Sequence, residues 1–246
     1  MPKVVTDKEY FRYMEADIFQ NPESSWLEVF CQRAMMIRGY SVRNVARILA
    51  QFPQATYVAG RQQYEESGIY VLNGATAIRI YAPLAKGEQK TRTYSAVDVY
   101  DISQTSARHR RTPRQPSPAE HLKKVCLLAK AAGLSVVSAD LVSGAWKVLE
   151  GNVLYIKDGI PTQIAAQLVA QELLRLAIEQ EHPELAWLAT QISVVASYAL
   201  EASYGYEVPP LAHTYKMTLC TNGRLLTYVD IAVRTAKRMA RQLKKM

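Results

Sequence analysis

Residues 38–60, RGYSVRNVARILAQFPQATYVAG, decide the fold of the first half of the chain. Apolar side chains recur there every three or four positions, which predicts an amphipathic helix. Ser41 is expected to cap the start of this helix, Gln51 to lie at its end, and Pro53 to stop it. The pattern then changes to a short strand over residues 55–58. This stretch therefore predicts the beginning of a small α+β domain.

The flanking elements extend this α+β domain. Asn73-Gly74 is a strong hairpin signal, so we expect it to join two paired strands. A further segment alternates apolar and polar residues and is expected to close the sheet. In chain order, the expected elements are a loosely ordered start, a helix, the two hairpin strands and the closing strand, over residues 1–22, 26–37, 69–72, 77–81 and 94–100.

The second half is predicted to be mostly helical with a small sheet. Gly133 is expected to end its first helix. The helices are expected over residues 121–132, 162–178, 185–203 and 225–243, and the strands over residues 135–137, 145–149 and 152–156.

We therefore expect two domains, residues 22–105 and 119–246, joined by a linker over residues 106–118. This segment holds four arginines, three prolines and no large apolar residue, which is typical of a linker. Its arginines could contact phosphate, but a solvated linker is the favoured interpretation.

The formal net charge of +8 is unevenly distributed. Residues 1–118 hold sixteen basic and eleven acidic side chains, and the tail 234–246 holds six basic and none acidic. Residues 119–233 hold eight basic and eleven acidic side chains. A polyanion is therefore expected to meet the first half or the tail, with an ordinary solvated surface as the alternative.

Composition excludes several classes of protein. With 49% hydrophobic and 21% charged residues, the chain can bury a sizeable core. No run approaches the ~20 apolar residues of a membrane span, and residues 1–10 lack the apolar core of a secretory signal. The three cysteines are far apart, which favours reduced thiols over disulfides or a metal knuckle. We expect a cytoplasmic protein with no membrane contact and no cofactor.

A series of motifs runs in order through residues 38–105. They are Tyr40-Ser41 with Asn44, the segment from Gln51 to Gly60, Gly68, Gly74, Ala82-Pro83, and VDVYDISQT at residues 97–105. In order and spacing they resemble the N-terminal domain of ArdC-type antirestriction proteins, found on plasmids and conjugative elements. The resemblance implies binding of single-stranded DNA, with RNA as another possible strand. The chain departs from the family at Tyr64, where tryptophan is usual, at Asn73-Gly74-Ala75, which replaces a lysine-bearing hairpin, and at Tyr100, which replaces phenylalanine.

The residues of this domain point to the same chemistry. Single strands are held by a basic groove and by aromatic rings on which bases stack. Seven tyrosines, including Tyr70, Tyr81 and Tyr94, interleave here with arginines and lysines, although most are expected to be half-buried sheet residues. The candidate nucleic-acid contacts are Arg38, Tyr40, Arg43, Tyr57, Arg61, Tyr64, Arg79, Lys86, Lys90 and Arg92. Asn44 and Gln104 are expected to fix backbone turns or strand ends.

The second half resembles the metallopeptidase-like domain that follows in that family, where a helix carries H-E-x-x-H. Here the aligned residues are Gln171-Glu172-Leu173-Leu174-Arg175. Two histidines four residues apart share one helix face and bind zinc, whereas glutamine is a poor ligand and arginine is a fixed positive charge. Residues 190–193, where the third ligand is expected, contain no acid. We therefore expect no metal, no catalytic residue, and an ion pair between Glu172 and Arg175.

The four histidines, His109, His121, His182 and His213, lack metal-ligand spacing and are expected to have surface or core roles. Together these features predict an antirestriction-type accessory protein that binds single-stranded DNA and carries an inactive metallopeptidase-like domain. Two alternatives stay open: a metallopeptidase with non-standard ligands, and a protein-interaction scaffold.

Overall fold

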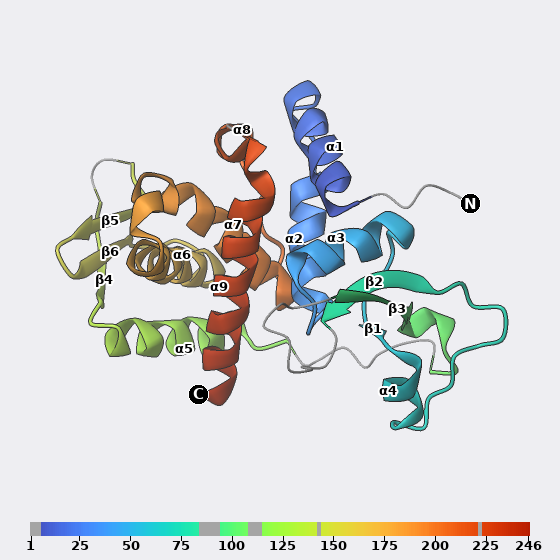
Figure 1. Ribbon diagram of the computed structural model, residues 1–246. Coiled ribbons are helices and arrows are strands. Elements are labelled where there is room, and N and C mark those ends of the chain that lie inside the picture. The colour runs from blue at the N-terminus through green and yellow to red at the C-terminus, as the bar shows by residue number, and fades with distance from the viewer. Residues whose placement is uncertain (1–5, 84–93, 108–114, 142–143, 221–222) are drawn as a thin grey trace, which may run out of the picture. The chain divides into compact units, whose positions relative to one another are not determined.

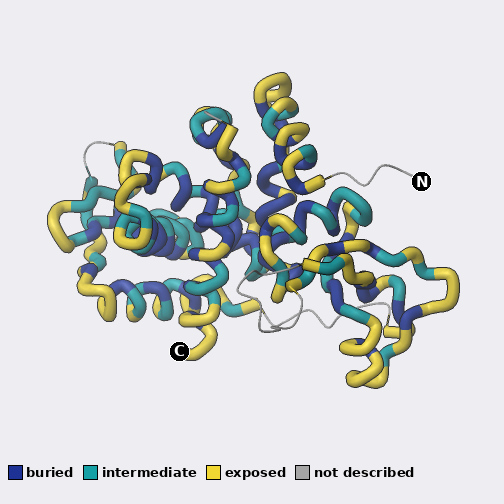
Figure 2. Tube along the Cα trace, viewed as in Figure 1, coloured by how far each residue is buried: buried dark blue, intermediate teal, exposed yellow. Residues whose placement is uncertain are grey.

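The computed structural model describes residues 6–83, 94–107, 115–141, 144–220 and 223–246. The chain divides into two compact units, Met1–Pro113 and Arg114–Met246, so that the division falls within the predicted linker. Figure 1 shows the elements of both units, and Figure 2 shows that each unit has buried residues of its own.

The N-terminal unit begins with three helices, α1 (Asp7–Gln20), α2 (Trp26–Met36) and α3 (Val42–Gln51). The two helices predicted from periodicity, α2 and α3, are confirmed. The Ser41 hydroxyl accepts a hydrogen bond from the backbone N–H of Asn44 at 3.3 Å, as expected of an N-cap.

The prediction that residues 1–22 are loosely ordered is wrong for residues 7–20, which form α1. Thr6 and Glu9 form a capping box, in which each side chain accepts from the backbone N–H of the other, at 2.8 and 3.2 Å. Phe11 and Met14 are buried, and the Phe11 ring lies 5.1 Å from that of Phe30 in α2. The sequence carried the signals of this helix, because the capping box is followed by apolar residues spaced for one helix face, namely Tyr10, Phe11, Met14 and Ile18.

The sheet of this unit is antiparallel, with strand order β1-β3-β2. Its strands are β1 (Val58–Ala59), β2 (Ile78–Pro83) and β3 (Tyr94–Asp101). The short helix α4 (Arg61–Glu65) follows β1, and the short helix η1 (Ile102–Gln104) follows β3. The expected closing strand is confirmed as β3. The short helix α4 was not expected from the sequence.

The expected hairpin between residues 69–72 and 77–81 is wrong. The turn itself forms, because the N–H of Ala75 donates to the carbonyl of Leu72 at 3.2 Å and Gly74 adopts a positive φ of 81°. The strands around it do not pair with each other. Val71 bridges to Thr105 instead, while β2 pairs along its whole length with β3.

The C-terminal unit combines a small mixed sheet with a group of helices. In the sheet β6 lies between β4 and β5, parallel to β4 and antiparallel to β5. The elements of the C-terminal unit are α5 (Pro118–Ala131), β4 (Ser135–Ala139), β5 (Lys147–Glu150), β6 (Val153–Lys157), α6 (Thr162–Glu181), η2 (Pro183–Leu188), α7 (Ala189–Ser203), α8 (His213–Cys220) and α9 (Leu225–Lys245). All the predicted helices and strands are present, whereas α8 was not anticipated.

One apolar segment in this unit passes the length and hydropathy test for a membrane span, contrary to expectation. It is Pro183–Ser203, with a mean hydropathy of 1.2, and 67% of its apolar window is buried inside the fold. That burial is typical of a core helix. The three cysteines are free thiols, with Cys31 and Cys220 buried and Cys126 half-buried.

Candidate functional site

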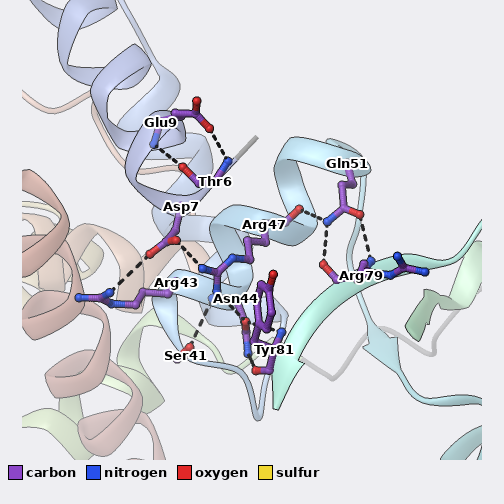
Figure 3. Close-up of polar contacts among 10 residues, drawn as sticks. All are labelled: Thr6, Asp7, Glu9, Ser41, Arg43, Asn44, Arg47, Gln51, Arg79 and Tyr81. Carbon is purple, nitrogen blue, oxygen red and sulfur yellow. Dashed lines mark hydrogen bonds and ion pairs between the residues drawn. The ribbon is translucent and has the colours of Figure 1, made fainter. Parts of the chain in front are cut away.

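Two side-chain amides of α3 bind the outer edge of strand β2 in the N-terminal unit (Figure 3). Asn44 donates to the carbonyl of Tyr81 at 2.8 Å and accepts from its N–H at 3.3 Å. Gln51 makes the same pair of bonds with Arg79, both at 2.9 Å. The two amides thus take the place of a neighbouring strand and fix β2 against α3. Gln104 likewise donates to the carbonyl of Thr76 at 2.8 Å, so the structural roles expected for Asn44 and Gln104 are confirmed.

Ion pairs and a ring contact extend from this edge (Figure 3). Asp7, in the first turn of α1, accepts from Arg47 at 2.6 Å and lies 3.7 Å from Arg43. The guanidinium of Arg47 lies 4.7 Å from the centre of the Tyr81 ring, a cation–π distance. Arg79 pairs with Asp98, its direct cross-strand neighbour, at 3.3 Å.

The predicted contact residues fall into different environments. Four arginines are exposed, namely Arg38, Arg43, Arg61 and Arg79. Tyr40 and Tyr57 are half-buried, and burial, reinforced by the Tyr57 hydroxyl, raises the pKa of Tyr40. Lys86, Lys90 and Arg92 lie outside the described residues.

Tyr64 is a core residue rather than an accessible ring. Only 2% of it is exposed, and its hydroxyl lies 3.0 and 3.2 Å from the carbonyl oxygens of Tyr57 and Tyr100, to which it donates. The short helix α4 turns the ring inward against Tyr57. A base cannot reach it in this conformation, so its predicted role as a stacking residue is corrected.

Arg61, three residues earlier, remains accessible. Its guanidinium lies 5.3 Å from the centre of the Tyr100 ring, on the exposed start of α4. The buried ring holds the arginine in place while leaving its charge available to an anion.

Three residues at this sheet were missing from the predicted contacts: Arg47, Tyr81 and Tyr94. Tyr81 and Tyr94 are 47% and 57% exposed. A local signal existed for Tyr81, because residues two apart in a strand share a face and Arg79 was already a candidate. No local signal pairs Arg47 with Tyr81, since this contact depends on how α3 packs against β2.

In the C-terminal unit, the residues aligned with H-E-x-x-H lie on α6. Glu172 is 3% exposed, and its Oε1 accepts from Arg175 Nε at 2.6 Å, which confirms the predicted pair. Its Oε2 accepts from Lys147 Nζ, at the start of β5, at 2.9 Å. Arg175 also pairs with Glu179. Lys147 was not anticipated, because it is far from Glu172 in sequence.

These contacts determine the charge state of the cluster. Burial raises the pKa of Glu172, but the hydrogen bonds and positive charges of Lys147 and then Arg175 outweigh it and hold the pKa below its ordinary value. Burial lowers the pKa of Arg175, but Glu172 and Glu179 raise it above its ordinary value. Glu172 is therefore a carboxylate with a cation on each oxygen.

Such a cluster does not fit a metal ion. Both Glu172 oxygens already accept from cations, Gln171 offers a neutral amide, and Arg175 would repel a divalent cation. In residues 190–193, where the third metal ligand is expected, the Ser193 hydroxyl donates a hydrogen bond to the Thr190 carbonyl. Within the described ranges, no three histidine, cysteine or acidic side chains gather closely enough to hold a metal.

The described histidines lie elsewhere in the C-terminal unit. His121 is 2% exposed and its Nε2 lies 2.9 Å from Glu201 Oε1 in α7, with the Tyr204 and Tyr206 rings against it. Burial, with the charge of Glu201 next in importance, raises the pKa of Tyr206 to about 12. His182 lies 3.4 Å from Glu184. His109 lies outside the described residues.

The sequence matches no protein-family model and no curated protein. Solved structures with a similar fold include two of the antirestriction protein ArdC from plasmid R388. The Mn(II)-bound structure gives a TM-score of 0.57 at 14% identity and covers 97% of each chain. The metal-free structure gives a TM-score of 0.55 at 14% identity, covering 97% of this chain and 96% of that one. The chain therefore has the α+β fold of the ArdC antirestriction protein over nearly its entire length.

Proposed function

We propose that this chain is an antirestriction-type accessory protein that binds single-stranded DNA through its N-terminal unit, and so coats or protects the strand. The observation that carries the proposal is the sheet of that unit, which exposes arginine and tyrosine side chains together. Single strands require this combination, because arginine contacts phosphate and aromatic rings stack on bases. The fold shared with ArdC supports the same assignment.

The C-terminal unit, in this proposal, has no metallopeptidase activity. Glu172 is the one residue of the H-E-x-x-H pattern that the chain retains, and Lys147 and Arg175 occupy both of its oxygens. Despite burial, the two cations hold the pKa of this carboxylate below its ordinary value, which makes it a poor acceptor of a proton from water. Free thiols in all three cysteines agree with a cytoplasmic location, which we also propose.

Fluorescence anisotropy with labelled single-stranded and double-stranded oligonucleotides tests the binding proposal. The single strand is expected to bind more tightly, and its affinity is expected to fall as salt rises. Arg61→Ala and Arg79→Ala should each weaken binding and reduce the slope of log affinity against log salt by about 0.7. Arg12→Ala is the matched control, because Arg12 is an exposed arginine of the same unit that lies on α1. Absence of binding, or binding that does not depend on salt, would reject the proposal.

Two exposed tryptophans of the C-terminal unit favour a second candidate, a protein-interaction scaffold. Trp146 and Trp187 are 54% and 65% exposed, and tryptophan is enriched at protein interfaces. The same titration separates the two candidates, because a scaffold of this kind would have no affinity for either oligonucleotide. The remaining alternative, a metallopeptidase with non-standard ligands, predicts a stoichiometric metal in the purified protein, which elemental analysis would detect.

A further inference from the structure

The open side of the β2–β3 ladder carries two exposed tyrosines from neighbouring strands. Arg79 and Tyr81 in β2 share this side with Tyr94, Ala96 and Asp98 in β3, because residues two apart in a strand point the same way. Tyr81 lies opposite Ala96, whereas Tyr94 lies opposite Pro83. The two tyrosines are therefore diagonal neighbours, roughly 7 Å apart along the sheet surface. Ala96, which lies opposite Tyr81, has a small side chain and is itself exposed.

Arg47 fixes the orientation of the Tyr81 ring. Its guanidinium lies 4.7 Å from the ring centre and donates a hydrogen bond to the Asp7 carboxylate at 2.6 Å. Arg47 is itself mostly shielded, with 19% of its side chain exposed, whereas 47% of Tyr81 is exposed. One part of the ring is thus held against the protein while the rest faces solvent. A ring fixed before binding loses little conformational entropy when a ligand stacks on it.

The charge around these rings has the sign that a phosphate backbone needs. Arg43 and Arg47 pair with Asp7, and Arg79 pairs with Asp98 in the central strand β3. Among the described residues, this leaves an excess of one positive charge beside two exposed aromatic rings. Rings for bases with cations for phosphates are the combination that single-stranded nucleic acid requires.

We infer that Tyr81 and Tyr94 form the stacking platform on which the protein holds the bases of a single strand, with Arg47 as the residue that positions Tyr81. This inference rests on the proposed function and names the part of the sheet that would perform it. It also gives α1 a role, because Asp7 at its start anchors Arg47.

The test uses the full chain and two fluorescein-labelled oligonucleotides of equal length, dT20 and an abasic strand with the same phosphates. Tyr81→Leu and Tyr94→Leu should each weaken dT20 binding on the order of ten-fold, and should leave abasic binding unchanged. Tyr70→Leu is the matched control, because Tyr70 is 63% exposed in the same unit but lies outside the β2–β3 ladder. An rU20 strand shows whether the platform accepts RNA as well as DNA.

Arg47 is tested as a positioning residue. Arg47→Lys keeps the charge beside Asp7 but removes the planar group from the ring. It should weaken dT20 binding by a few-fold and leave the abasic strand unaffected. A general loss of folding or of phosphate contact would instead lower both affinities equally, and that result would overturn the assignment of Arg47.

The outcomes separate the platform from the proposed function. If the unmodified protein binds neither strand, both are overturned. If it binds dT20 and Arg61→Ala weakens that binding while both tyrosine variants bind normally, the platform alone is overturned. Nitration of tyrosines in the unmodified protein, read by peptide mass spectrometry, needs no variant: dT20 should protect Tyr81 and Tyr94 but not Tyr70. Equal nitration of all three with and without dT20 would contradict the platform.

Discussion

Replacing the two cations on Glu172 should destabilise the C-terminal unit, and replacing Glu172 as well should restore it. Each cation donates a charge-assisted hydrogen bond to a carboxylate that is 3% exposed, and such bonds contribute about 1.5–3 kcal/mol. Arg175→Met and Lys147→Met keep most of the aliphatic length and remove the charge. Since Glu172 retains one partner in either variant, each should lose about 2 kcal/mol.

The double variant leaves a buried carboxylate without a cation, for which the cost is about 3–5 kcal/mol. Adding Glu172→Leu removes that carboxylate, and apolar replacement of a complete buried ion cluster is often neutral or stabilising. The triple variant should therefore be more stable than the double variant. Lys157→Met is the control, because Lys157 lies in the adjacent strand β6 and forms no ion pair with any residue that the structure describes.

Urea denaturation gives the free energies of unfolding, and hydrogen exchange of α6 peptides assigns the change to the C-terminal unit. A triple variant as unstable as the double variant would refute the reasoning, because the loss would then come from packing. A double variant as stable as the unmodified protein would show that the pairs do not form in solution.

Three further predictions concern other parts of the fold. Asn44→Ala or Gln51→Ala should cost about 1 kcal/mol each and speed hydrogen exchange at the edge of β2, where these amides hold the backbone. Tyr64→Phe should also cost about 1 kcal/mol by removing a buried hydroxyl, yet leave single-strand affinity unchanged, because the ring is in the core. The unmodified protein should be more stable than Glu172→Gln, because its cations favour the ionised Glu172. This difference in unfolding free energy should be fully present above the ordinary glutamate pKa of 4.5 and lost as pH falls through the lower pKa of folded Glu172. Urea denaturation of both proteins at several pH values would measure it.

Local signals predicted most elements, and the failures have identifiable causes. Ser41 capped its helix as expected because an N-cap depends only on residues within one turn. The capping-box pattern of Thr6 and Glu9 was equally readable, and Tyr10, Phe11, Met14 and Ile18 form one apolar helix face behind it, so the prediction of a loosely ordered start failed although the local signals were present. Asn73-Gly74 made its turn, yet a turn does not choose the partner of the strand that follows.

The same distinction applies to the candidate sites. The pair between Glu172 and Arg175 was predictable because both lie on one helix, three residues apart. Lys147 belongs to a strand, and only the packing of the sheet against α6 brings it to Glu172. Tyr64 was misassigned because spacing along the chain does not show whether a ring points inward. Exposure then separates Tyr81 and Tyr94 from Tyr64.

The cations around Glu172 can replace one property of a metal and not another. A divalent cation in such a site neutralises carboxylates and also accepts an electron pair from water, which lowers the pKa of that water. Like a divalent cation, the Lys147 ammonium and the Arg175 guanidinium neutralise the charge of Glu172. Unlike a metal ion, their nitrogens have no vacant orbital that could accept an electron pair from a water oxygen. Because both cations are part of the chain, their contribution to stability does not depend on metal concentration, as that of a bound ion would. The cluster is thus suited to hold α6 and β5 together through ion pairs, which agrees with the proposal that this unit is not a metallopeptidase.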